Sequence, residues 1–91
     1  MSEKYLKNLI EIFLSINNYK LMKDFLEGIL TRKELDEIPR RLEIVKRLNQ
    51  EQSHHGIARD LGVGVATVSR GSRELKAGRF KILKRNKYKA K

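Results

Sequence analysis

Hydrophobic residues recur at helical spacing from Glu3 to about Asn17. Such spacing places them on one face of an amphipathic helix. Ile12 and Leu14 widen this face beyond one stripe, which indicates a helix covered on two sides, either by another subunit or by the rest of the same chain. The face itself consists of Leu6, Leu9, Ile10, Phe13 and Ile16.

The next two apolar segments also have helical spacing, and each follows a capping residue. The asparagines at 17–18 can end the first helix and cap a second, whose end Gly28 marks. Thr31 and Glu34 have the spacing of a capping box, in which each side chain accepts a hydrogen bond from a free backbone N–H at a helix start. The pattern therefore predicts a short third helix over about 32–37.

Pro39 predicts a break near the middle of the chain. Proline has no backbone N–H, and it disfavours helical geometry at the preceding residue, Ile38. We therefore expect a new helix over about 39–49, with Pro39 in its first turn. Its inward face is expected to contain Leu42, Ile44, Val45 and Leu48.

The following segment has the pattern of a helix-turn-helix. Ser53 can cap its first helix, residues 62–64 form a turn, and a second helix runs over about 65–76. Two helices that pack at a steep angle need a small side chain at their contact, here Ala58, and a turn residue that tolerates positive φ, here Gly62. A plain helical hairpin would share the apolar spacing, but it would not explain the polar outer face.

The outward face of the second helix carries short polar and basic side chains once Val68 and Leu75 point inward. Such groups suit the major groove of DNA, which is roughly 12 Å wide. Hydroxyl groups can hydrogen-bond to base edges or phosphates, and an alanine methyl can contact thymine. The outward residues are Ala66, Thr67, Ser69, Arg70 and Arg73, and Lys76, Arg79 and the first tail residues are expected on phosphates.

Positive charge is concentrated in the second half of the chain. The 91 residues carry a formal net charge of +10, and residues 50–91 hold eleven Lys and Arg against three Asp and Glu. This charge attracts nucleic acid through counterion release, although it does not identify DNA. Residues 79–91 hold seven basic residues and no acid, so we expect a short helix that frays into a flexible basic arm. We expect Phe80, Leu83 and Ile82 to dock this short helix on the rest of the protein. Membrane-surface binding is the other interpretation of this arm.

Several classes of protein are disfavoured by what the chain contains. There is no cysteine, no apolar run near the roughly 18 residues of a membrane span, and no signal-peptide pattern at the start. His54 and His55 point roughly 100° apart on a helix, so they form no two-ligand metal face, and either reach DNA or face solvent. A chain without cysteine fits a reducing cytosol, so we expect a cytoplasmic protein. Without a catalytic constellation we expect that it is not an enzyme and has no metal and no required cofactor.

Three motifs are more specific than the general pattern. They are Ile29-Leu30-Thr31, Arg40-Arg41-x-x-Ile44-Val45 and Gly62-x-Gly64-x-Ala66-Thr67-Val68-Ser69-Arg70-Gly71-Ser72-x-x-Leu75-Lys76. A generic helix-turn-helix has no reason to follow Ser69-Arg70 with Gly71-Ser72. On these motifs, which span residues 28–76, the chain resembles the Trp repressor family.

The resemblance implies an all-α fold of about six helices and an intertwined homodimer. Residues 1–78 would form the domain, with a dimerisation core at 1–49, a helix-turn-helix at 53–76 and a basic arm at 79–91. The dimer would bind double-stranded DNA at a palindromic operator, with its two recognition helices about 34 Å apart. Carried over by position, the DNA contacts are Gly64, Val65, Ala66, Thr67 and Ser69, with His55 and Lys76 in support.

The resemblance also implies a site for an amino-acid corepressor, L-tryptophan. Arg41 and Arg70 would sandwich its ring, and Arg70 would pair with its carboxylate. Gly71 would leave space for the ring. Thr31 and the carbonyls of Ile29 and Leu30 would line the pocket.

Glu74 departs from the family, whose tryptophan-binding members have a serine there. Its carboxylate could pair with the ligand's ammonium group. It could equally bridge to Arg70 or Arg73 one turn away and close the pocket, which would leave a regulator with another ligand or none. Arg41 and Arg70 would then be surface charges that contact phosphate or a carboxylate.

Three functions therefore compete at this stage. The first is a sequence-specific transcription regulator, most simply a repressor, and the polar face of the second helix-turn-helix helix favours it. The second is a structural protein that compacts DNA without sequence preference, driven by net charge. The third is an enzyme or its DNA-reading module, which the lack of catalytic residues disfavours.

Overall fold

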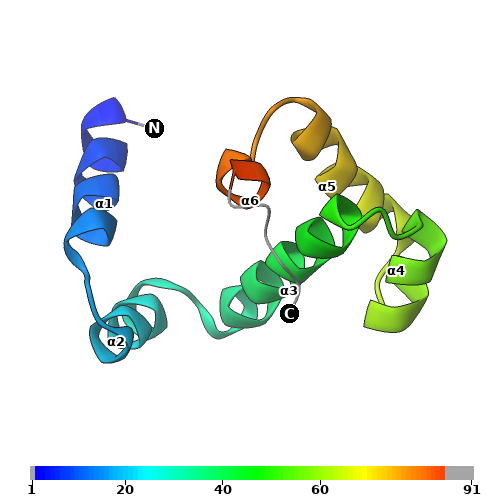
Figure 1. Cartoon of the computed structure of the whole chain (residues 1–91). Helices are drawn as coiled ribbons and strands as arrows, with labels where there is room; N and C mark the ends of the chain where they lie inside the picture. The colour runs from blue at the N-terminus through cyan, green and yellow to red at the C-terminus, as the bar shows by residue number, and fades with distance from the viewer. Residues whose placement is uncertain (1, 86–91) are drawn as a thin grey trace. The chain divides into compact units, whose positions relative to one another are not determined.

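The computed structural model describes residues 2–85, which form six α-helices (Figure 1). The predicted all-α fold of about six helices with a helix-turn-helix is confirmed. The chain divides into two compact units whose boundary lies between Leu35 and Asp36, inside the third helix. The helices are α1 (Glu3–Ser15), α2 (Tyr19–Ile29), α3 (Arg32–Asn49), α4 (His54–Leu61), α5 (Val65–Lys76) and α6 (Lys81–Arg85).

The first unit contains α1 and α2, which are amphipathic as predicted. The Asn18 side chain caps α2 by accepting a hydrogen bond of 2.8 Å from the backbone N–H of Leu21. The rings of Phe13 and Phe25 meet edge to face with their centroids 5.4 Å apart, so they join the apolar faces of the two helices. Neither helix contains a buried residue, and Leu14 remains 80% exposed.

The α3 helix is continuous from Arg32 to Asn49, so the predicted break at Pro39 is wrong. Its start has the predicted capping box, because the backbone N–H groups of Thr31 and Glu34 each donate to the other residue's side chain. Pro39 removes a single hydrogen bond, the one to the carbonyl of Leu35. The helix is already nucleated before that point, and the Leu, Glu, Lys and Arg residues on both sides favour its propagation.

In the second unit, α3 contributes to two buried clusters. Ile44 packs with Ile57, Ala58 and Val68 of the helix-turn-helix. Val45 packs instead with Leu75 and with Leu83 of α6. Each cluster is extended by half-buried apolar side chains, which are Leu48, Leu61 and Val63 for the first and Leu48 and Phe80 for the second.

Leu42 does not belong to this core, although the sequence pattern placed it on the inward face. It is 47% exposed, while Ile44 and Val45 are buried. Side chains two positions apart in an α-helix are rotated by roughly 200° about the helix axis, so Leu42 cannot point in the same direction as Ile44. The direction in which Ile44 and Val45 point therefore decides the buried face of α3.

The C-terminal segment docks on the second unit through two of the three expected residues. Leu83 is buried and Phe80 packs beside it, whereas Ile82 is 65% exposed. The expected basic arm beyond residue 85 lies outside the described residues. None of the described helices is long and apolar enough to cross a membrane.

The α3 helix ends in a left-handed turn at Glu51, where φ is 67°. The backbone N–H of Gln52 donates to the carbonyl of Arg47 at 3.1 Å, and that of Glu51 to Leu48 at 2.9 Å. This pair of bonds is a Schellman motif, in which glycine is the residue usually found at the left-handed position. Glu51 therefore adopts a conformation that its Cβ disfavours.

We expect Glu51→Gly to stabilise the protein by about 0.5–1 kcal/mol, because the relief of left-handed strain exceeds the added entropy of the unfolded chain. Urea unfolding at a fixed protein concentration measures this change. Gln50→Gly is the matched control, since φ at position 50 is not positive, and it should not stabilise. Equal effects of the two substitutions would contradict strain at Glu51.

Candidate nucleic-acid interface and adjoining cavity

The turn between α4 and α5 has the geometry that its glycines predict. Ser53 caps α4 by accepting a hydrogen bond of 3.0 Å from the backbone N–H of Gly56. Gly62 ends that helix in the left-handed region, with φ 68° and ψ 35°, as expected for the turn residue. Gly64 then starts α5 with an extended backbone and no side-chain cap.

The α5 helix buries one face and exposes the other. Val68 is fully buried, and Gly71, Ser72 and Leu75 are buried on the same side. These positions follow helical spacing, so their burial fixes which way every other residue of α5 points. The exposed face is therefore set by the packing of α5 against α4 and α3.

The expected DNA contacts lie mainly on that exposed face. Ser69 is half-buried, and His55 is exposed in the first turn of α4, on the other helix of the pair. The structure thus leaves most of the expected residues exposed in the first and last turns of α5, where consecutive residues point in different directions around the helix. Those that are exposed are Gly64, Val65, Ala66, Thr67, Arg73 and Lys76.

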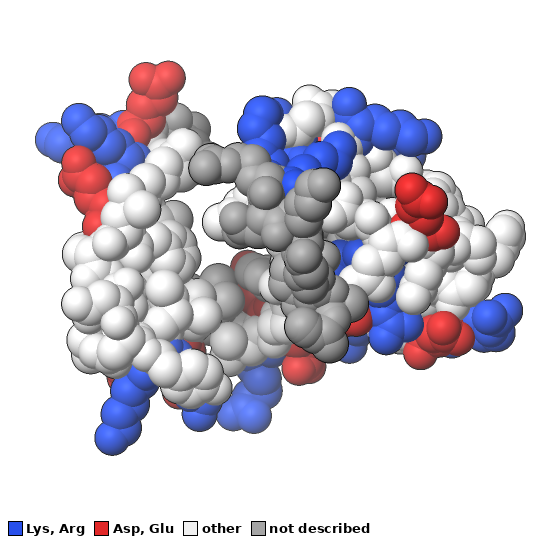
Figure 2. Space-filling model, in the orientation of Figure 1, with Lys and Arg blue, Asp and Glu red and all other residues white. Residues whose placement is uncertain are grey.

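Basic side chains continue from the end of α5 into α6. Figure 2 shows Lys and Arg gathered over this end of the molecule. They include Arg73, Lys76, Arg79, Lys81 and Lys84, all exposed. The segment from residue 75 to residue 85 contains no acidic residue, so its charge is uniformly positive.

Three charged residues near the end of α3, Glu43, Lys46 and Arg47, form ion pairs instead. Arg47 donates to the Glu43 carboxylate at 2.9 Å and lies 3.7 Å from Asp60 of α4. The hydrogen bond from Arg47, helped by the charge of Lys46, holds the pKa of Glu43 below its usual range. The Glu43 carboxylate therefore stays charged at neutral pH. It pairs with the side chains of Lys46 and Arg47, whose charges would otherwise add to the basic surface.

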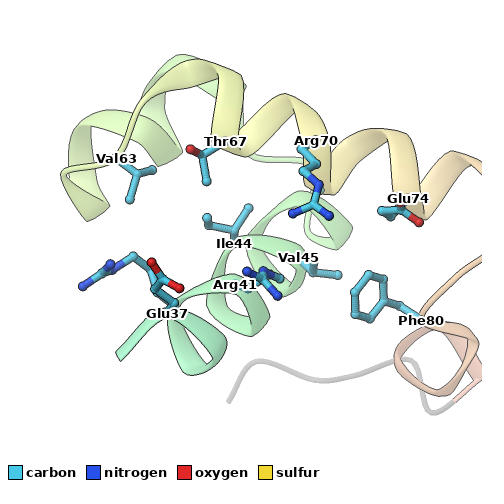
Figure 3. A pocket seen from close by; sticks show the side chains of 11 residues that line it. Glu37, Arg41, Ile44, Val45, Val63, Thr67, Arg70, Glu74 and Phe80 are labelled. Carbon is cyan, nitrogen blue, oxygen red and sulfur yellow. The ribbon is translucent and has the colours of Figure 1, made fainter. Parts of the chain in front are cut away.

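A cavity of about 360 Å³ lies between α3 and α5 (Figure 3). Four of the expected ligand residues line it, namely Arg41 on α3 and Arg70, Gly71 and Glu74 on α5. Two arginines and a carboxylate around apolar walls can bind a molecule with both charged groups and a flat ring. The apolar walls are Ile44, Val45, Val63 and Phe80.

The sequence analysis missed several residues of this cavity. Glu37 and Arg40 line it from α3, and Thr67 lines it from α5. Glu37, Arg41 and Ile44 are spaced by four and three residues and so share one helix face. The predicted break at Pro39 hid this spacing, because it assigned Glu37 and Arg41 to different helices.

The other three expected ligand residues belong to the first unit. Ile29 is the last residue of α2, and Leu30 caps that helix. The Thr31 hydroxyl accepts a hydrogen bond of 3.1 Å from the backbone N–H of Glu34. Thr31 thus has a structural role as the start of α3.

Comparison with known proteins agrees with this arrangement of helices. The family described as Trp repressor protein matches residues 4–85, which is most of the chain. The chain belongs to the Trp repressor family. Proteins of this family are regulators, and membership supports a DNA-binding regulator.

Curated relatives of this Trp repressor family member cover most of its length. The Trp operon repressor homolog of Xylella fastidiosa strain M23 is 33% identical over 86 residues, which are 93% of this chain and 94% of the relative. The homolog of strain 9a5c has the same identity and coverage. The uncharacterized protein YerC of Bacillus subtilis strain 168 is 31% identical over 75 residues, 79% of this chain and 72% of its own. No solved structure gives a significant match.

Two positions of the Trp repressor motif have environments that the sequence did not reveal. Glu74 lies 3.9 Å from the Arg79 guanidinium, so its ion pair is with the residue after α5 and not with Arg70 or Arg73. A Cβ on Gly71 would lie 3.4 Å from Ile44 and 3.5 Å from Leu48, which is ordinary van der Waals contact, so this position of α5 faces α3 with room for little more than a methyl group. The cavity stays open beside both residues.

Among residues 2–85, no group of three or more His, Cys, Asp and Glu side chains is arranged to hold a metal ion. His54 and His55 occupy successive positions in the first turn of α4, with only His55 exposed. Both histidines therefore lie in the first helix of the helix-turn-helix, where they can meet DNA or solvent.

Proposed function

We propose that this Trp repressor family member is a sequence-specific transcription repressor that binds a palindromic operator as a homodimer. The observation that carries the proposal is the orientation of α5. Its buried face is fixed by Val68 and Leu75, so that its first turn exposes Ala66 and Thr67 and its last turn exposes Arg73 and Lys76. Because its partner is DNA and its named relatives are bacterial, we place its action in the cytoplasm.

The exposed face of α5 has the chemistry needed to read bases as well as phosphates. The Thr67 hydroxyl can donate to or accept from a base edge, and the Ala66 methyl can contact thymine. Arg73 and Lys76, in the last turn, supply charge for the phosphate backbone without sequence preference. A protein that only compacts DNA would need the charges but not the small side chains of the first turn.

The chain should prefer its operator over random duplex DNA by about 4 kcal/mol or more at physiological salt. An operator selected from a random palindromic pool and a scrambled duplex, titrated in parallel, measure this difference. Thr67→Ala should weaken operator binding by about 1–3 kcal/mol and leave scrambled DNA unaffected. Lys76→Ala is the matched control, because loss of a phosphate contact should weaken both duplexes equally.

Equal affinity of the wild-type protein for the two duplexes would contradict sequence specificity. It would favour the alternative of a structural, non-specific DNA-binding protein, for which the basic surface of α5 and α6 is sufficient. Counterion release, which is measured by the salt dependence, would then supply nearly all of the binding free energy. The comparison therefore separates the two candidate functions directly.

The proposed dimer rests on the apolar faces of the first unit. Leu6, Ile10 and Ile12 of α1 are each between 44% and 47% exposed, and Leu14 is 80% exposed. Monomeric soluble proteins seldom leave so much contiguous apolar surface in water, and such surface marks an interface. A second copy supplies a complementary apolar face by symmetry.

We expect Ile10→Asp to dissociate the dimer, because it places a charge within the apolar face of α1. Sedimentation equilibrium over a range of protein concentrations measures the change. Lys7→Asp introduces the same residue on the polar side of the same helix, and it should leave the dimer intact. A wild-type protein that sediments as a monomer at micromolar concentration would disprove the dimer.

We further propose that the cavity between α3 and α5 binds a small ligand that controls DNA binding, with L-tryptophan as the first candidate. Arg41 and Arg70 project into it from facing helices (Figure 3), where guanidinium groups can stack on an aromatic ring. Thr67 and Arg70 line the cavity and also belong to the recognition helix. A ligand at this position would therefore act directly on the helix that reads DNA.

Isothermal calorimetry should show saturable binding of L-tryptophan, which Arg70→Ala weakens by about tenfold or more through loss of a charge-assisted hydrogen bond. Arg73→Ala is the matched control, since it removes the same charge from α5 at a position that does not line the cavity. Absence of binding heat at millimolar L-tryptophan would contradict tryptophan gating. Equal losses in the two variants would contradict the assignment of Arg70.

A further inference from the structure

One wall of the cavity comes from neither α3 nor α5. Phe80 lies in the connection that follows α5, and its ring stands beside Val45 at the edge of the cavity (Figure 3). The same ring packs against the buried cluster of Val45, Leu75 and Leu83. Phe80 therefore lines the cavity and also contacts the residues that dock α6.

The backbone of Phe80 is held in an unusual conformation. Its φ is 61°, which is rare for a bulky residue and persists only where the surrounding structure enforces it. The Phe80 carbonyl accepts a hydrogen bond of 3.1 Å from the backbone N–H of Leu83, at the start of α6. The residue that forms the cavity wall is thus also the residue from which α6 begins.

A second link joins the same connection to the cavity. The backbone N–H of Arg79 donates to the carbonyl of Glu74 at 3.0 Å, and the Arg79 guanidinium lies 3.9 Å from the Glu74 carboxylate. Glu74 itself lines the cavity. Two adjacent residues, Arg79 and Phe80, therefore connect the cavity to the α6 segment.

We propose that Phe80 is a ligand-contacting residue of this cavity and that it couples ligand binding to the docking of α6. A flat ring held between Arg41 and Arg70 can meet the Phe80 ring edge to face or offset, which favours the docked position of Phe80. By linkage, the ligand stabilises docked α6 by the same factor by which docking raises ligand affinity. This inference rests on the ligand function proposed above.

The coupling also reaches the surface proposed for DNA. The α6 helix carries Lys81 and Lys84, which are exposed and follow the basic end of α5. A ligand that favours docking of α6 keeps these charges beside the recognition helix. The cavity therefore influences both base reading by α5 and phosphate binding by α6.

The test uses the full chain, with L-tryptophan as the probe and calorimetry as the first measurement. Phe80→Ala and Phe80→Gly both remove the ring, but glycine also relieves the positive φ. If ring contact is what matters, both variants lose affinity by about tenfold. Ile82→Ala is the matched control, because Ile82 is exposed on the same segment and does not line the cavity, and it should bind as the wild type does.

Hydrogen exchange of the Leu83 amide, followed by NMR, measures the coupling itself. Saturating L-tryptophan should slow this exchange in the wild type and in Ile82→Ala, but not in Phe80→Gly. Exchange of the Val68 amide in α5 shows that the helix-turn-helix of each variant remains folded. A purely structural Phe80 would alter exchange in the free protein without changing its response to the ligand.

The outcomes separate the two proposals. Wild-type affinity for L-tryptophan in both Phe80 variants overturns the role of Phe80 and leaves the ligand function standing. Weaker binding without any effect of the ligand on Leu83 exchange overturns the coupling. No binding of L-tryptophan to the wild type overturns the tryptophan function and this inference together.

Discussion

The packing of α3 against α5 is the contact on which the rest of the second unit depends. Gly71 faces Ile44 and Leu48 across this contact, at a distance where a methyl group would make ordinary van der Waals contact and a longer side chain would meet both residues. A larger side chain there would separate the helices and open the cluster that holds Val68. The same contact defines the cavity, since the two helices form its facing walls.

This contact also explains how the proposed reading of DNA and the proposed binding of a ligand can share one helix. An α-helix can present three different faces around its circumference when only a narrow face is buried. In α5 the buried face is centred on Val68, the cavity face contains Arg70 and Glu74, and the outer face contains Ala66 and Arg73. Any change in the position of α5 relative to α3 therefore alters all three faces together.

Local sequence chemistry predicted the helices, their caps and the helix-turn-helix. Asn18, Thr31 and Ser53 cap helices as their side chains allow, and Gly62 adopts the left-handed conformation that the turn requires. The motif from Gly62 to Lys76 was also sufficient to indicate the family that the comparison then showed. These features depend on neighbours a few residues apart, so the sequence contains nearly all the information that decides them.

Helix cooperativity and tertiary contacts decided the remainder. Pro39 lies within a helix because cooperative propagation on both sides outweighs one missing hydrogen bond, which local rules alone do not weigh. Glu74 pairs with Arg79, and Phe80 reaches the cavity, because the chain turns back after α5 and docks Leu83 beside Val45. The sequence by itself thus determined most of the helical segments and the helix-turn-helix whose second helix we propose as the DNA-reading helix. Only the packing of residues distant in the chain determined the cavity and its third wall, since that packing depends on shape and burial rather than on local spacing.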